Sequence, residues 1–354
     1  GFTVGTGNGV NESGDTFIYM AFAKNATNNN TLANSFKVKT YTGNGSTQEI
    51  TGIGFKADLL WIKQTNDSNP HGIWDTTRGA GKLLKPNSSD AEINNVGDLV
   101  GYFLDDGFQV NRNHGVHSAY DNTNHSGSTY VAWAWKAGNG WQSNTDGAIS
   151  SLTNANTGNK FSVVRYKGTG SATTVGHDLG YAPTFMIVKT VESSAKWRVY
   201  HSTMGGTKAM NLNDAFGPGT SANYWNDTAP TSSVFSVGQD LSVNGENHIA
   251  YVWSDCDGYS KFSTYTGTGS TQTITTGFRP DWILTKDITQ ASDNWRMYDT
   301  VRGLDKVLYP ALTQAQDTNA TGITAVTSTG FTLGTGNLSN KNGSDYIYIA
   351  FKMN

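Results

Sequence analysis

The sequence predicts an all-β protein made of tandem antiparallel β-sandwich domains of the jelly-roll or lectin-like kind. Three observations support this fold class. Gly occurs 41 times and Pro only 7 times, and charged residues make up 15% of the 354 residues. Turn residues separate short apolar runs at intervals of about 8–12 residues, a spacing typical of β-sandwiches. Finally, the chain repeats itself and shows almost no helical periodicity.

Three similar segments begin at Tyr41, Tyr166 and Tyr265. Each predicts a strand, a Gly-rich turn, a second strand, a Gly-aromatic corner and an apolar strand that ends in lysine. The Gly-rich pieces are interpreted as turns, because a Thr-rich strand follows where a phosphate loop would need a helix. Each unit closes on an aromatic strand, at 130–136, 248–254 and 346–352. These closing strands are apolar on both faces, which predicts a central place in the sheet.

The repeats define the domain organisation. We predict closing strands of a partial repeat at 1–25, a linker at 26–36, sandwich repeats at 37–138, 160–255 and 256–354, and a second linker at 139–159. Both linkers are polar, rich in Asn, Thr and Gly and free of Pro, which favours flexible or loosely packed chain. Residues 1–22 nearly duplicate 330–351. This duplication leaves two explanations: truncation or processing of a longer array, or strands that complete a neighbouring domain or chain.

Composition also excludes several classes of function. The 25 basic and 28 acidic residues give a net charge of -3 without a basic stripe, so no nucleic-acid partner is expected. The sequence contains no run of 18 apolar residues, so no membrane span is expected. The single cysteine, Cys256, cannot form an intrachain disulfide.

The motif Asp-Thr-x-Arg-Gly is the first candidate for chemistry. It occurs in the first and third repeats, as Asp75 with Arg78 and as Asp299 with Arg302. In the second repeat the acid and the base are both replaced. An ion pair that braces a turn would be lost in this way, because losing one partner alone leaves a buried charge unpaired. We therefore predict structural ion pairs at these positions.

No enzyme is predicted. Glycoside hydrolysis needs two carboxylates about 5–10 Å apart, and the motif supplies one per repeat. A hydrolase that pairs Asp58 or Asp281 with Asp75 or Asp299 is the alternative.

Loop residues are the candidates for glycan or partner contact, because aromatic faces stack on sugars while polar side chains bind hydroxyl groups. Burial of the same aromatic side chains at a subunit contact is the alternative. The candidates are His114, His117, Tyr120, His125, Tyr224 and Trp225. No cofactor or metal is predicted. The alternatives are a divalent metal at the His-x-x-His spacing in 114–117 and calcium at 254–260, where the distal Glu of a calcium loop is missing.

The repeated unit "YTGxGSTQxI…GFxPDWIxxK…W…DTxRG…GF…YIAWxWK" resembles a repeat of bacteriophage tail-fibre and other virion proteins, especially of marine phages that infect cyanobacteria and related hosts. The likeness covers nearly all of residues 36–354 and, through its last part, 1–25. The second repeat departs from the pattern at 182–185 and 201–205. The resemblance implies structural or adhesive domains and transfers no catalytic residue.

Together these observations predict a virion or extracellular appendage protein, such as a tail fibre or surface spike. It would attach to a host through many weak contacts. The expected partners are copies of itself, other virion proteins and a host-surface polysaccharide or receptor. A polysaccharide depolymerase array and a bacterial surface adhesin or filament subunit are the alternatives.

Overall fold

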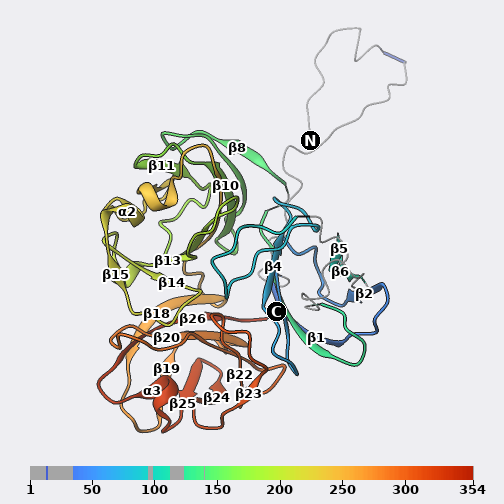
Figure 1. Ribbon diagram of the computed structural model, residues 1–354, viewed down its shortest axis with the longest axis vertical. Helices are drawn as coiled ribbons and strands as arrows, with labels where there is room; N and C mark the ends of the chain where they lie inside the picture. The colour runs from blue at the N-terminus through green and yellow to red at the C-terminus, as the bar shows by residue number, and fades with distance from the viewer. Residues whose placement is uncertain (1–12, 15–34, 95–98, 112–122, 139, 354) are drawn as a thin grey trace.

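The computed structural model describes residues 13–14, 35–94, 99–111, 123–138 and 140–353 (Figure 1). The described chain consists mainly of antiparallel strands with a few short helices, so the predicted all-β fold class is confirmed. Three groups of sheets, one for each sequence repeat, lie around a common centre (Figure 1).

Each repeat contains the same four central strands in the same order; they form a four-stranded sheet in repeats 1 and 3 and the middle of an eight-stranded sheet in repeat 2. In all three, the closing strand lies between the first strand of the repeat and the apolar strand that ends in lysine. The sheet of repeat 1 is β1 (Phe36–Thr42), β7 (Thr129–Trp135), β3 (Leu59–Gln64) and β4 (Gly72–Asp75). Repeat 2 has β10 (Phe161–Lys167), β17 (Asn247–Trp253), β12 (Phe185–Thr190) and β13 (Arg198–His201). Repeat 3 has β18 (Ser260–Thr266), β26 (Asp345–Phe351), β20 (Trp282–Asp287) and β21 (Arg296–Asp299).

A smaller outer sheet completes each sandwich. The outer strands are β2 (Gln48–Thr51), β6 (Gly107–Val110) and β5 (Val100–Leu104) in repeat 1, β11 (Thr173–Gly176) and β16 (Val234–Val237) in repeat 2, and β19 (Gln272–Thr275), β25 (Gly330–Leu333) and β24 (Ile323–Thr327) in repeat 3. The remaining elements are β14 (Lys208–Asn211), β15 (Gly219–Thr220), β22 (Lys306–Val307), β23 (Asp317–Thr318), α2 (Ala222–Trp225), α3 (Asn337–Asn340) and two 3-10 turns, Ser202–Met204 and Gln239–Leu241.

Equivalent contacts recur in the three repeats. The last residue but one of each repeat's first strand is a tyrosine whose hydroxyl donates to a backbone carbonyl: Tyr41 to Thr123 at 2.7 Å, Tyr166 to Leu241 at 2.7 Å and Tyr265 to Ser339 at 2.6 Å. The turn that follows contains a glycine with positive φ, at Gly45, Gly170 and Gly269. These left-handed positions favour glycine, in agreement with the predicted turns.

The second predicted linker is strand rather than flexible chain. Within 139–159, strands β8 (Gln142–Asn144) and β9 (Ser151–Asn156) form a hairpin that pairs with β10 and widens the sheet of repeat 2. The polar composition obscured this hairpin, because its buried side chains are asparagine, serine and threonine side chains that are held by hydrogen bonds. The amide of Asn154, for example, donates to the Asp58 carboxylate at 3.0 Å.

Each central sheet is buried on both faces. In β7, the side chains of Tyr130, Ala132 and Ala134 face the core inside repeat 1, whereas Val131, Trp133 and Trp135 face a second core. That second core, here called the shared core, is formed by the inner faces of all three central sheets. The closing strands are therefore apolar on both faces because one face packs inside its own repeat and the other packs against the other two repeats.

The repeats form a closed ring of three rather than a row of self-sufficient modules. The ring of Trp135 lies 6.4 Å from Trp253 of repeat 2, and 5.7 Å and 5.8 Å from Trp282 and Phe351 of repeat 3, between ring centroids. Phe185 of repeat 2 stacks on Phe262 of repeat 3 at 5.5 Å. A small repeat buries little apolar surface by itself, and the shared core provides additional buried apolar surface.

Candidate functional site

The loop residues predicted as glycan contacts have different fates. His114, His117 and Tyr120 lie outside the described residues. His125 is exposed; its backbone N–H donates to the Tyr130 hydroxyl at 2.8 Å, and its ring lies 3.3 Å from the Ser128 hydroxyl.

The prediction of an exposed sugar platform at Tyr224 and Trp225 is wrong for Trp225. This indole is fully buried in the core of repeat 2, where it packs edge-on against Tyr200 and donates to the Lys208 carbonyl at 3.0 Å. The short helix α2 turns it inward. Tyr224 is half-buried, and the Arg198 guanidinium lies 4.4 Å from its ring centroid.

Both predicted ion pairs are present and buried. In repeat 1, Arg78 Nε lies 2.6 Å from Asp75 Oδ2, and the side chains are 3% and 0% exposed. Arg302 and Asp299 repeat the same 2.6 Å contact in repeat 3. The negative charge of Asp75 and a second carboxylate, Glu92, raise the pKa of Arg78 against the effect of its burial.

Each ion pair also receives a donor from the closing strand of another repeat. The Tyr251 hydroxyl of repeat 2 donates to Asp75 Oδ2 at 2.7 Å, and the Trp133 indole of repeat 1 donates to Asp299 Oδ2 at 3.2 Å. Strand register makes Ile349 the equivalent of these two donors in repeat 3. These pairs therefore hold the ring together at two of its three junctions, a structural arrangement with no open face on the carboxylates.

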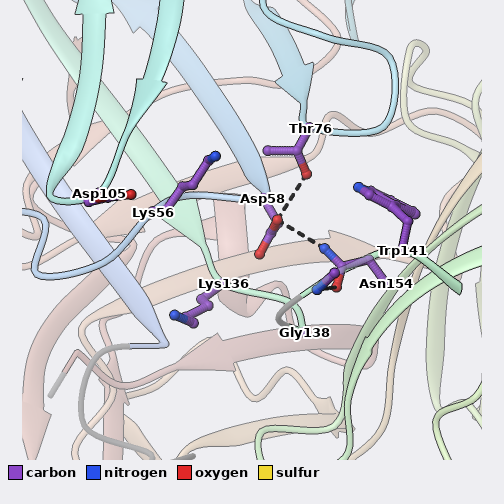
Figure 2. Close-up of a pocket in the computed structure, with 9 residues that line it drawn as sticks. Lys56, Asp58, Thr76, Asp105, Lys136, Gly138, Trp141 and Asn154 are labelled. Atoms are coloured by element: carbon purple, nitrogen blue, oxygen red, sulfur yellow. Dashed lines mark hydrogen bonds between the residues drawn. The ribbon is translucent and has the colours of Figure 1, made fainter. Parts of the chain in front are cut away.

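An open pocket of about 350 Å³ lies at the junction between repeats 1 and 2 (Figure 2). It is here called the Trp141 pocket. Its lining comes from the corner before β3, the turn after β4, the turn between β5 and β6, the segment between β7 and β8, and strand β9 of repeat 2. The lining residues are Lys56, Asp58, Thr76, Asp105, Lys136, Gly138, Gly140, Trp141 and Asn154.

Asp58 lies at the base of the Trp141 pocket, and its two oxygens accept three hydrogen bonds. The donors are the Thr76 hydroxyl at 2.9 Å, the Asn154 amide at 3.0 Å and the Ala137 backbone N–H at 2.8 Å. Burial raises the pKa of Asp58, and the bonds from Thr76 and Ala137 oppose that shift. Asp58 thus ties β3, β7 and the hairpin of repeat 2 together.

Repeat 3 contains the same arrangement at Asp281. Its carboxylate accepts from the Thr300 hydroxyl at 3.0 Å and from the Met353 backbone N–H at 2.9 Å. The place of the Asn154 amide is taken by the guanidinium of Arg279. Because this carboxylate recurs with the same two donors in another repeat, its first role is to fasten the sheet.

The other side chains of the Trp141 pocket are available to a ligand. Trp141 is half-buried, while Lys56 and Asp105 are exposed. Figure 2 shows Trp141 and Asn154 on one side of Asp58, with Lys56 and Asp105 on the other. An aromatic face beside an ammonium group and a carboxylate can stack on a ring and bind its hydroxyl groups. Sequence reasoning missed Trp141 because it lies in the segment predicted as a linker.

Two further sequence expectations concern metals and membranes. In the proposed calcium segment, the Asp255 carboxylate pairs with Lys261 and accepts from the Phe262 N–H at 2.9 Å. No group of three or more metal-binding side chains is found in the part of the chain that the structure describes. Within that part, no helix is both long and apolar enough to span a bilayer.

Comparison with known protein families identifies the family of this chain. A family model described as "Domain of unknown function (DUF7483)" matches residues 32–354, and the chain therefore belongs to this family. The match spans all three repeats, as the shared core does. No curated protein matches the sequence.

Proposed function

We propose that this member of the DUF7483 family is a non-catalytic structural module of a virion appendage or another extracellular surface that binds host polysaccharide weakly and many times over. The observation that carries the proposal is the half-buried indole of Trp141, which lines an open pocket together with Lys56, Asp105 and Lys136. The resemblance of the repeats to tail-fibre domains supports the extracellular setting.

The chemistry of the pocket suits a sugar ring. The indole offers an apolar face for the C–H groups of a pyranose, and the ammonium and carboxylate groups donate to and accept from its hydroxyls. A contact of this kind gives an affinity of about millimolar, near -4 kcal/mol. Copies of the chain in one assembly would raise the effective affinity by about 10²–10⁴.

A glycan array probed with the multivalently displayed chain tests the proposal, followed by titration calorimetry with the oligosaccharides that bind. Trp141→Ala removes the stacking face and should abolish binding at the Trp141 pocket. Tyr102→Ala is the matched control, because Tyr102 is 65% exposed in the same repeat and does not line the pocket. An array without bound glycans, or a Trp141→Ala chain that binds as tightly as the wild type, would overturn the proposal.

A depolymerase is the second candidate, and one observation favours it. Asp58 and Asp105 both line the pocket, and burial raises the pKa of Asp58, as a general acid requires. Against it, both oxygens of Asp58 already accept structural hydrogen bonds. Release of reducing ends from a polysaccharide that the chain binds, lost in both Asp58→Asn and Asp105→Asn, would favour the enzyme over the binding module.

Assembly with copies of itself and with other virion proteins is part of the same proposal. Electron microscopy of the native particle distinguishes a phage spike or fibre from a filament on a bacterial surface, which is the remaining alternative.

A further inference from the structure

A second pocket lies at the junction between repeats 3 and 1. It has a volume of about 360 Å³ and is here called the threonine pocket. The end of β1, the turn after β3 and the start of β7 supply most of its lining, and repeat 3 supplies two side chains. The lining residues are Thr40, Tyr41, Thr42, Thr65, Thr129, Tyr130, Arg302 and Gln316.

Threonine hydroxyl groups dominate the accessible part of this lining. Thr40, Thr42 and Thr129 are exposed, and the hydroxyls of Thr65 and Thr129 lie 2.6 Å apart. A hydroxyl both donates and accepts, so a pair of them matches the paired hydroxyls of a sugar.

The rings of the two tyrosines face the core of repeat 1 rather than the pocket, and Tyr130 is 1% exposed. The rings of Tyr41 and Tyr130 stack with centroids 5.1 Å apart. The hydroxyl of Tyr41 donates to the Thr123 carbonyl at 2.7 Å, and that of Tyr130 accepts from the His125 N–H at 2.8 Å. A ligand in the pocket would therefore meet threonine hydroxyls and the side chains of Arg302 and Gln316.

The threonine pocket carries no net charge. Its one cation, Arg302, is paired with Asp299 at 2.6 Å and donates to the Gln316 side chain at 3.0 Å. A neutral pocket rich in groups that donate and accept favours a neutral polyhydroxyl ligand over an anion, which needs an unpaired cation.

The equivalent pocket between repeats 1 and 2 shows what is particular to this one. The two places are related by matching backbone bonds: Gln316 N–H to the Thr65 carbonyl and Glu92 N–H to the Val191 carbonyl, both at 2.8 Å. That second pocket is smaller, about 140 Å³, and its lining includes the charged residues Arg78, Lys82, Glu92, Arg165 and Glu192.

We propose that the threonine pocket is a second saccharide site, selective for neutral sugars and independent of the Trp141 pocket. Strand register places the two sites at opposite ends of one sheet, because Leu59 at the start of β3 pairs with Trp135 and Gln64 at its end pairs with Tyr130. A strand of this length spans about 20 Å. One chain would then contact two sugar units and be bivalent before any assembly.

Calorimetry with neutral oligosaccharides from the array, on four full-length chains, tests the proposal. Thr65→Val with Thr129→Val removes two hydroxyls at nearly constant volume and should weaken this site by at least about tenfold. Trp141→Ala should leave this site intact. Val191→Thr, the equivalent position in the charged pocket, is the matched control and should bind like the wild type. Thermal unfolding of each chain verifies that it folds.

The outcomes separate the two proposals. Two sites in the wild type, one in Trp141→Ala and one in the double valine chain support both. One site that Trp141→Ala leaves intact and the double valine chain loses supports the threonine pocket and contradicts the proposed function. A Trp141→Ala chain without neutral-sugar binding, a double valine chain that binds as well as the wild type, or binding of acidic sugars alone would overturn the threonine site.

Discussion

Two of the three junctions in the ring contain a buried ion pair, and the third does not. The two pairs are Asp75 with Arg78 and Asp299 with Arg302. The carboxylate of each pair also accepts a hydrogen bond from the closing strand of a neighbouring repeat. At the junction of repeats 2 and 3 the acid, the base and the donor are all replaced. His201, Met204 and Ile349 occupy these places. The junction without a charged pair is thus the one in which the acid, the base and the donor are all replaced. Replacing only one or two of them would leave a buried charge unpaired.

The largest expected effect comes from breaking one charged set. Arg78→Met leaves Asp75 buried without its cation, while Glu92 keeps only Lys82 at 3.4 Å. The substitution should lower the free energy of unfolding by about 3–5 kcal/mol. Denaturation in urea measures the change.

A matched swap tests the cause. Asp75→His, Arg78→Met and Tyr251→Ile together rebuild the set found at the third junction and should destabilise the protein by less than Arg78→Met alone. A triple variant that is less stable than the single one would contradict the comparison.

The aromatic residues of the shared core and of a single repeat should also behave differently. Trp135 contacts rings from all three repeats, whereas Trp225 packs inside repeat 2. Either change to alanine should cost about 3–5 kcal/mol. Hydrogen exchange should rise in the central sheets of every repeat for Trp135→Ala, but mainly in repeat 2 for Trp225→Ala. Identical exchange patterns would show that the shared core has no special role.

The third junction should weaken in acid. Burial lowers the pKa of His201 from 6.5 to about 4, and its Nε2 has no partner among the described protein groups. Since the unfolded chain then binds the proton more readily, stability is complete above pH 6.5 and falls as the pH drops towards 4, by up to about 3 kcal/mol.

His201→Gln should remove this part of the pH dependence. The difference between the two stability curves isolates it from His248, whose pKa burial lowers to about 4, and from His71 and His177, whose pKa values burial also lowers. Parallel curves for both chains between pH 6.5 and 4 would contradict the assignment.

The smallest expected effect concerns the bond that joins the hairpin to repeat 1. Asn154→Ala removes one of three hydrogen bonds to Asp58 and should cost about 1–2 kcal/mol. Urea denaturation compares it with Gln142→Ala, whose exposed side chain donates to Asp178 from the same hairpin. An equal and negligible loss in both chains would show that Asn154 does not fasten the junction.

The sequence was informative wherever a pattern recurred. The strands after Tyr41, Tyr166 and Tyr265 and the two ion pairs follow from repetition, because equivalent residues meet equivalent surroundings. The closed arrangement of the three repeats could not be predicted. A closing strand that is apolar on both faces must be buried on both faces, but its sequence does not reveal which part of the protein packs against each face.

The candidate site was less accessible to sequence reasoning. Trp141 and Asn154 lie in a polar stretch that resembles a linker, and hydrogen bonds to Asp58 hold that stretch in the fold without an apolar pattern. Trp225 was predicted to be an exposed contact but is buried, because the sequence of a Tyr-Trp pair in a loop does not reveal which of the two rings turns inward.

Calorimetric unfolding of the intact chain tests the shared core most directly. Three repeats that share one core should unfold in a single transition whose van't Hoff enthalpy equals the calorimetric enthalpy. Three resolved transitions, or a calorimetric enthalpy about three times the van't Hoff value, would show that the repeats are independent domains and would contradict the closed ring.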